Sequence, residues 1–229
     1  PWGYMECNPD KFKVHHHEPA PSYDEQKTDH ILSQRRNHPE REYFGADYQG
    51  SRYHSMLSYF PKDMTILDIA CGSGFGSKLL APISKEVVGV DYDPEAIKVN
   101  QERYSGVENL NFLTGDGQTF LYKDGAYFDC VISFHTLEHV PSDSAMMNQI
   151  YENLKPGGLA IVEVPLLAKR PLGKPVNPYH LREYEVQEVL GFFDNTRFKI
   201  EKVYGACRGI YVPSESARDA LQVWARKHK

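Results

Sequence analysis

The chain has 229 residues, of which 41% are hydrophobic and 25% charged, and its formal net charge is −5. This length suits one large α/β domain with a modest extension, and its core needs neither a metal nor a disulfide to fold. The acidic balance disfavours a dedicated nucleic-acid-binding protein, and no apolar run is long enough for a membrane span or a signal-peptide core. We therefore expect a cytoplasmic protein, and its four scattered cysteines are expected to be reduced thiols, with Cys71 and Cys130 buried.

The N-terminal region, residues 1–47, is polar, contains prolines and shows no clear period. We expect an arm here, with a short helix near residues 31–36, and a domain boundary before residues 48–229. The arm either covers the active site or simply packs on the domain. Consecutive side chains of an extended chain point to opposite sides, so His15–His17 would chelate poorly together, and we expect no metal site.

From Tyr53 onward the apolar pattern predicts regular elements. Tyr53, Met56, Leu57 and Phe60 recur at helical spacing, which predicts a helix over residues 48–60. Strands are expected at 64–70, 86–92, 109–115, 128–134, 156–165, 197–205 and 208–213, with helices at 75–83, 95–104, 142–154, 183–193 and 217–224. Asp93 and Ser142 are positioned to cap two of these helices. Strands that alternate with helices indicate an α/β fold with a doubly wound, mostly parallel sheet of seven strands.

A glycine-rich loop follows the first expected strand, with Gly72, Gly74 and Gly76 at alternate positions. Parallel strands put their following loops at one edge of the sheet, where doubly wound folds bind ligands. The three glycines would let a ligand come close to the backbone at a helix N-terminus. By itself this pattern also fits nicotinamide or flavin enzymes, or a purely structural turn.

Three acidic residues narrow the choice of ligand. Asp91 ends the second strand, where it could accept hydrogen bonds from two ribose hydroxyls or cap a helix. Asp68 stands four residues before the first glycine, where a carboxylate disfavours a pyrophosphate and suits a positively charged ligand. Asp116 follows the third strand and could accept from an adenine amino group or simply form a turn. Ribose, adenine and positive charge together point to S-adenosylmethionine.

Four motifs in order resemble the class I S-adenosylmethionine-dependent methyltransferases. They are "LDIACGSGFGS", "VVGVDYDPEAI", "GDGQTF" with "FDCVISFHTLEHV", and "LKPGGLAIVEVP", and the likeness covers residues 65–204. The resemblance implies a Rossmann-like fold that binds S-adenosyl-L-methionine. The cofactor-binding residues that it implies are Asp68, Ala70, Gly72, Ser73, Gly74, Asp91, Tyr92, Asp116, Gly117, Phe134, Tyr53 and Arg52.

Shorter matches are similar to a subgroup associated with bacterial glycan, polysaccharide and small-molecule biosynthesis. They are the Arg52-Tyr53 pair before the first strand and the Asn-Pro-x-His segment at residues 177–180. The acceptor is then expected to be a sugar, a glycan intermediate or a small hydroxylated metabolite. An acceptor on nitrogen or carbon stays open, and so do a non-catalytic cofactor-binding partner subunit, a nicotinamide-dependent oxidoreductase and a homodimer.

Methyl transfer to an alcohol needs a base that takes the hydroxyl proton. His180 lies in a long loop after the fifth strand and is the preferred acceptor-facing residue. His135 follows the fourth strand directly and is the second choice, whereas the Glu138-His139 pair is expected to shape the wall of the site. Each of these histidines could instead be a hydrogen-bonded packing residue.

Overall fold

The computed structural model describes Tyr53, Leu57, Phe60 and residues 62–167, 179–193, 196–207, 210–213 and 220–229. Tyr53 and Leu57 are both helical, as expected. The arm at residues 1–47, Arg52 and Asn177-Pro178 lie outside the described residues, so the predictions made for them are not tested. Within the described part, no helix is both long enough and apolar enough to cross a membrane.

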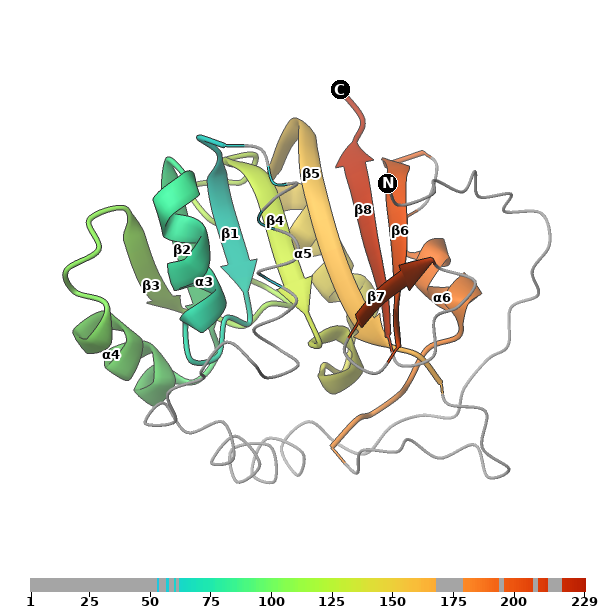
Figure 1. The fold of residues 1–229 in the computed structure, drawn as a ribbon, viewed down its shortest axis with the longest axis horizontal. Coiled ribbons are helices and arrows are strands. Elements are labelled where there is room, and N and C mark those ends of the chain that lie inside the picture. Colours follow the sequence, from blue (N-terminus) through green and yellow to red (C-terminus); the bar gives the residue numbers. More distant parts are fainter. Residues whose placement is uncertain are drawn as a thin grey trace.

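A single twisted sheet organises the domain, with strand order β3-β2-β1-β4-β5-β8-β6-β7 (Figure 1). Strands β1 to β5 form parallel pairs, while β8 is antiparallel to both of its neighbours, β5 and β6. Strand β6 therefore runs in the same direction as β1–β5, which confirms a mostly parallel sheet. The strands are β1 Thr65–Ile69, β2 Glu86–Asp91, β3 Leu110–Thr114, β4 Phe128–Phe134, β5 Leu154–Pro165, β6 Phe198–Cys207, β7 Ile210–Pro213 and β8 Ala220–Lys227.

Helices cover both faces of this sheet, and their ends follow the expected chemistry. The Asp93 side chain accepts hydrogen bonds from the first-turn amides of α4, and Ser142 does the same for α5. Glu185 and Glu188 form a reciprocal capping box at the start of α6. The helical segments are α3 Phe75–Leu80, η3 Ala81–Ile83, α4 Pro94–Arg103, η4 Leu137–His139, α5 Asp143–Asn153 and α6 Val186–Gly191.

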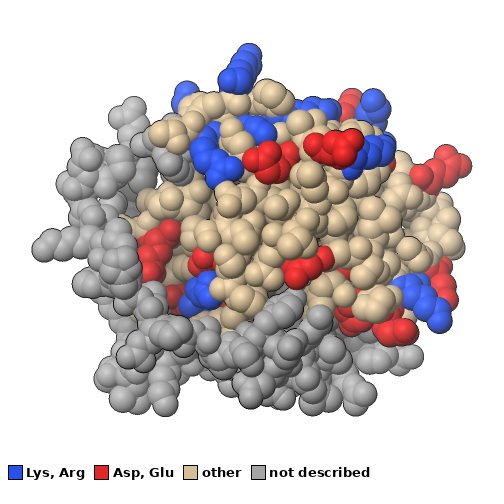
Figure 2. Space-filling model, turned by 180° about the vertical axis from the view of Figure 1, so that it is seen from behind, with Lys and Arg blue, Asp and Glu red and all other residues tan. Residues whose placement is uncertain are grey.

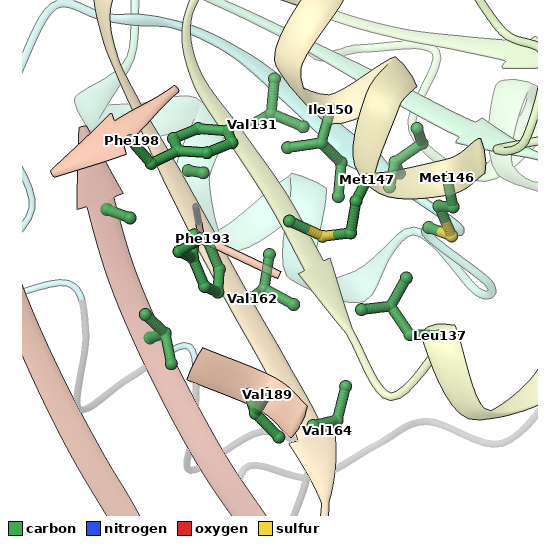
Figure 3. Packing of buried hydrophobic residues seen from close by; sticks show 14 of the residues in the cluster. Val131, Leu137, Met146, Met147, Ile150, Val162, Val164, Val189, Phe193 and Phe198 are labelled. Atoms are coloured by element: carbon green, nitrogen blue, oxygen red, sulfur yellow. The ribbon is translucent and has the colours of Figure 1, made fainter. Parts of the chain in front are cut away.

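The core is divided between the two faces of the sheet. Figure 3 shows the larger cluster, in which Met146, Met147 and Ile150 of α5 pack on Val131 and Val162 of the central strands. Helix α6 and two phenylalanines continue this cluster toward β8 through Val189, Phe193 and Phe198. The second cluster lies under α3 and α4 and includes Leu80, Ile97, Phe112, Ile132 and Trp224. Burial on both faces explains why the strands show almost continuous apolar runs.

The C-terminal segment corrects one prediction. We expected a helix over residues 217–224 because Ala217, Ala220, Leu221 and Trp224 have helical spacing, but Ala220–Lys227 forms strand β8. This strand lies between β5 and β6, and residues 210–213, within the strand expected at 208–213, form the short β7 at the sheet edge. Residues Ala220–Ala225 are all buried because β8 is inserted between β5 and β6 with a helix layer behind it. A strand that is buried on both faces shows no clear alternation of apolar and polar residues, so its apolar spacing can imitate that of a helix.

Two features distinguish the ends of the strands. Strand β5 begins two residues before the strand expected at 156–165, and near this start its pairing with β4 shifts register and Gly157 has a φ of +78°. Figure 2 shows Lys and Arg side chains gathered along the top of the rear face, where β8 ends, intermixed with Asp and Glu. The opposite edge, at the carboxyl ends of β1–β5, carries the predicted site.

Of the two described thiols, Cys130 is buried as expected and Cys71 only half-buried.

Candidate active site

The glycine loop between β1 and α3 has a left-handed backbone at three positions. Ala70, Gly72 and Gly74 have φ values of +61°, +53° and +70°. Two side chains hold the loop in place, since the Gly72 amide donates to Asp91 Oδ2 at 2.9 Å and Asn100 Nδ2 donates to the Gly72 carbonyl at 2.7 Å. Asn100 was not among the residues predicted from the sequence; it is fully buried, where its side-chain amide needs a partner of this kind.

The three glycines make room for different neighbours. A Cβ on Gly74 would lie 2.6 Å from the Phe112 ring, and one on Gly76 would overlap the Tyr53 ring. A Cβ on Gly72 would meet no atom of the described residues within 4 Å. Packing within the protein therefore accounts for Gly74 and Gly76, and only Gly72 leaves its side open for a ligand.

Asp68 lies on β1 with its carboxylate on the face covered by α3. Ser77 Oγ donates to Oδ2 at 2.6 Å, and the Tyr53 hydroxyl donates to Oδ1 at 3.3 Å. The residue is only 1% exposed, and burial raises the pKa of its carboxyl group to about 6 despite these hydrogen bonds. The charge of Asp91 contributes to the same rise.

Asp91 ends the neighbouring strand β2 and is also buried. Its two oxygens accept from the backbone amides of Gly72 and Asp93, at 2.9 and 3.1 Å. Burial raises the pKa of Asp91, while these amide hydrogen bonds limit the rise. Strands β1 and β2 pair in parallel with Asp68 opposite Gly89, so the two carboxylates lie at the same edge of the sheet.

The loop after β3 reaches the same edge through the backbone. The Gly115 amide donates to the Asp91 carbonyl at 2.9 Å, and the side of Gly117 faces Met146 and Ile69. The Asp116 carboxylate accepts from the Gln118 amide at 2.9 Å, which is the turn geometry that we considered as its alternative role.

Aromatic residues border Asp68. The Tyr53 and Phe134 rings pack with their centroids 5.0 Å apart, and Phe134 is the last residue of β4. Ser73 accepts a hydrogen bond from the Tyr104 hydroxyl through its carbonyl. Tyr92 follows β2 and is half-buried. The structure thus brings the described members of the predicted cofactor set to adjoining strand ends and loops.

His135 lies between two buried carboxylates. Its Nε2 is 3.1 Å from Glu163 Oε1 and its Nδ1 is 3.2 Å from Glu138 Oε1, and the residue has a φ of +52°. Burial alone would raise the pKa of Glu138, but the hydrogen bond with His135 and the nearby imidazoles outweigh it and lower the pKa.

The contacts continue across the sheet into β8. Gln222 Nε2 donates to Glu163 Oε2 at 2.9 Å, and the Trp224 indole donates to the side-chain oxygen Oε1 of Gln222 at 2.8 Å. Neither Glu163 nor Gln222 was among the residues predicted from the sequence. A charged or amide side chain inside an otherwise apolar strand is the signal that could have identified them.

His180 lies beside His139, as the loop containing residue 180 folds back onto η4. The two imidazole centroids are 4.9 Å apart, and the Leu181 amide donates to the Glu138 carbonyl at 2.8 Å. His139 Nδ1 is 2.9 Å from the Tyr179 carbonyl oxygen, and His180 Nδ1 is 3.1 Å from Glu183 Oε1. Burial lowers the pKa of His139, and the neighbouring Glu138 charge only partly opposes this.

Residues 67–162 match the model of a protein family described as "Methyltransferase domain". A Mycolicibacterium smegmatis protein named "Probable S-adenosylmethionine-dependent methyltransferase" is 27% identical over 155 residues, which cover 67% of this chain and 59% of that protein. A ubiquinone biosynthesis O-methyltransferase of Xanthomonas axonopodis pv. citri is 26% identical over 163 residues, covering 63% and 66%. The chain spans less than two thirds of the length of either relative.

Solved structures share the fold. N-methyltransferase NodS from Bradyrhizobium japonicum, in complex with S-adenosyl-L-homocysteine, superposes with a TM-score of 0.65 at 17% identity, covering 86% of this chain and 98% of that one. The [4+2]-cyclase SpnF superposes with a TM-score of 0.67 at 17% identity, covering 92% and 98%. Taken together, the strand order and these superpositions show a Rossmann-like methyltransferase fold, within which residues 67–162 match the methyltransferase domain model.

Proposed function

We propose that the chain methylates a hydroxyl oxygen of a sugar, a glycan intermediate or another small hydroxylated metabolite, with S-adenosylmethionine as the donor. The observation that carries this proposal is the juxtaposition of two sets of groups at one sheet edge. The buried carboxylates of Asp68 and Asp91 lie near the carboxyl ends of β1 and β2, and a histidine–carboxylate cluster follows the adjacent strand β4.

The chemistry of the first set fits the cofactor. Asp68 receives its hydrogen bonds from the hydroxyls of Ser77 and Tyr53, and Asp91 receives its bonds from backbone amides, so the cited contacts neutralise neither charge. Two neighbouring buried carboxylates, of which Asp91 raises the proton affinity of Asp68, favour a cationic ligand beside them. We propose that Asp68 faces the cationic methionine end, that Asp91 accepts from the ribose, and that the open side of Gly72 contacts the ligand. Asp116, Gly117, Tyr92, Ala70, Ser73, Gly74, Phe134, Tyr53 and Arg52 complete the proposed set.

When bound, S-adenosylmethionine supplies a sulfonium methyl group to which the acceptor oxygen forms a new C–O bond, while the C–S electron pair returns to sulfur and leaves S-adenosylhomocysteine. The protein positions the two partners and helps to remove the hydroxyl proton. His180 is the preferred acceptor-facing residue because Glu183 holds its Nδ1, so that Nε2 is the ring atom left to accept the hydroxyl proton.

His135 is better suited to positioning than to accepting the acceptor's proton. Both of its ring nitrogens face carboxylates, one on η4 and one on β5. Removing a proton from an acceptor would require one of these contacts to break. We propose that His135 fixes the charged groups beneath the acceptor.

An oxygen acceptor is also supported by the relatives, which include O-methyltransferases of ubiquinone biosynthesis. The fold alone would not decide this, because its neighbours include both an N-methyltransferase and a cyclase. The glycan-associated subgroup rests on the short matches at Arg52-Tyr53 and residues 177–180, and it remains a prediction.

The test is incubation of the purified chain with methyl-labelled S-adenosylmethionine and a panel of nucleotide sugars, glycans, phenols and amines. We expect label on the oxygen of a hydroxylated acceptor, and a loss of turnover in His180→Ala with cofactor affinity retained. Label found only on nitrogen or carbon would overturn the oxygen assignment. Tight cofactor binding without turnover on any acceptor would favour a non-catalytic subunit instead.

A further inference from the structure

We propose that Glu138, His139 and His180 form a binding site for a divalent transition-metal ion such as Zn²⁺. Each residue offers one ligand atom, and these three atoms all lie within 4.8 Å of one another. From the sequence we expected no metal site, on the ground that His15–His17 would chelate poorly together, and His180 is distant in the chain from the adjacent Glu138-His139 pair.

The hydrogen bonds of the two histidines orient them as ligands. A carbonyl oxygen can only accept, so the contact between His139 Nδ1 and the Tyr179 carbonyl places the ring proton on Nδ1. The contact of His180 Nδ1 with the Glu183 carboxylate does the same for His180. Both imidazoles then carry a lone pair on Nε2. Carbonyl and carboxylate partners of this type orient metal-binding histidines and fix their tautomer.

Glu138 provides a second, independent observation. Its side chain is 0% exposed, and its Oε2 atom makes no hydrogen bond within the described part of the chain. A carboxylate oxygen that is buried without a hydrogen bond is costly unless a cation or a donor lies beside it. The Oε1 atom faces His135 on one side, and His139 Nε2 lies 3.9 Å away on the other.

The two segments that carry the ligands are fastened to each other. The Leu181 amide donates to the Glu138 carbonyl, and Arg182 bonds to the Pro141 carbonyl and to Asp143. Ligand atoms around one metal at about 2.0–2.2 Å lie roughly 3–3.5 Å apart, so small side-chain rotations would close the site. His139 and His180 are 18% and 11% exposed, which leaves a path for an ion.

Two imidazoles and one carboxylate suit Zn²⁺, Co²⁺ or Fe²⁺ better than Ca²⁺ or Mg²⁺, which prefer oxygen ligands. Three protein ligands leave at least one coordination position open. If the proposed function holds, the acceptor oxygen would take that position, and the metal would lower the pKa of the hydroxyl. His180 would then act as a ligand rather than as a free base. Only this consequence rests on the proposed function.

The test is titration of the metal-depleted full chain with Co²⁺, whose visible absorption reports histidine and carboxylate ligation without cofactor or acceptor. The reference protein carries His15→Ala, His16→Ala and His17→Ala, so that this histidine run cannot supply the signal. We expect one equivalent of Co²⁺ to bind and Zn²⁺ to displace it. His139→Ala and His180→Ala should each weaken binding by at least about 100-fold, and Glu183→Gln by about 10–100-fold.

His228→Ala is the matched control, because His228 is exposed at the C-terminal end of the chain, outside the cluster. It should leave the titration unchanged. Glu138→Gln tests the carboxylate, and far-UV circular dichroism verifies that this buried variant is folded. Absence of Co²⁺ binding in the reference protein would overturn the proposal, as would binding that survives in both His139→Ala and His180→Ala. Methyl transfer that persists without metal, in a protein that binds no Co²⁺, would reject the metal site and leave the proposed function standing.

Discussion

The two halves of the sheet are built differently. On the β1–β3 side, the contacts of the site come from strand ends and the loops that follow them, and the glycine loop is fixed by Asp91 and Asn100 from the next strand–helix unit. On the β4–β8 side, a row of polar side chains crosses three strands from His135 to Glu163 and Gln222, and a distant loop brings His180 onto η4. The first half is encoded in short motifs, and the second is assembled from residues far apart in the chain.

The largest expected effect is a difference in stability between two glycine variants on the β1–β3 side of the sheet. Gly74→Ala should lower the free energy of unfolding by about 2–5 kcal/mol, because it combines a left-handed backbone with a clash against Phe112. Gly72→Ala should lower it by only about 1–2 kcal/mol, since its side is open. Chemical denaturation measures both values. Calorimetry with S-adenosylhomocysteine measures the loss of cofactor affinity. For each kcal/mol of lost stability, Gly72→Ala should lose more affinity than Gly74→Ala. Equal losses in stability would contradict the packing role of Gly74.

The second prediction concerns a substitution in the row of polar side chains on the β4–β8 side of the sheet. Gln222→Leu removes the donor to Glu163 and the acceptor for the Trp224 indole, and it should destabilise the protein by about 2–4 kcal/mol. Cofactor affinity should be almost unchanged, because the row lies on the side that we propose for the acceptor. Gln101→Leu is the matched control, since this exposed glutamine makes one hydrogen bond to the Phe112 carbonyl and should cost less than about 1 kcal/mol. A similar denaturation midpoint for the two variants would argue against a buried network.

Asp68→Asn should change stability and binding in opposite directions. Ionising the Asp68 carboxyl group in the folded protein is unfavourable, since its pKa is raised from 3.8 to about 6, so neutral asparagine should stabilise the fold at pH 7 by up to about 3 kcal/mol. Affinity for S-adenosylmethionine should fall by about 10–100-fold with the loss of the charge. Thermal unfolding and calorimetry measure the two effects.

Asp129→Asn provides a control of opposite sign for the stability effect. Asp129 lies on β4 and accepts from Lys155 Nζ at 2.8 Å and from Thr65 Oγ1 at 2.7 Å. Although burial opposes it, these contacts lower the pKa of Asp129, so its neutral variant should lose stability at pH 7. If both variants lose stability, then the ionised Asp68 carboxylate does not destabilise the folded protein.

The smallest expected effect is a pH dependence of cofactor affinity. A pKa of about 6 means that Asp68 of the free protein binds a proton as the pH falls through 6, while a cationic ligand favours the ionised form. The dissociation constant of S-adenosylmethionine should therefore rise about tenfold between pH 7 and pH 5. The raised pKa of Asp91 would steepen this trend. The stability contribution of Asp68 should move the other way, increasing as the pH falls from 6 toward 3.8. An affinity that is flat in the native protein, or that keeps its slope in Asp68→Asn, would contradict the assignment.

The different construction of the two halves explains which parts of the site could be predicted from the sequence. The strands up to β6, the caps at Asp93 and Ser142 and the grouping of Asp68 and Asp91 at one edge followed from local pattern. The neighbours of Gly74 and Gly76 did not, because Phe112 and Tyr53 reach them across the fold. Glu163 and Gln222 were missed because a strand sequence does not say which residue of a neighbouring strand will lie opposite.

The sequence by itself determined the alternation of strands and helices, the bends at the glycine loop and the type of domain, because these depend on short-range periodicity, backbone freedom and ordered motifs. Only the tertiary structure decided that residues 220–227 form a strand, since their burial depends on insertion between β5 and β6. It also decided that His180 joins Glu138 and His139, because contacts between distant segments arise from packing and hydrogen bonding of the whole chain.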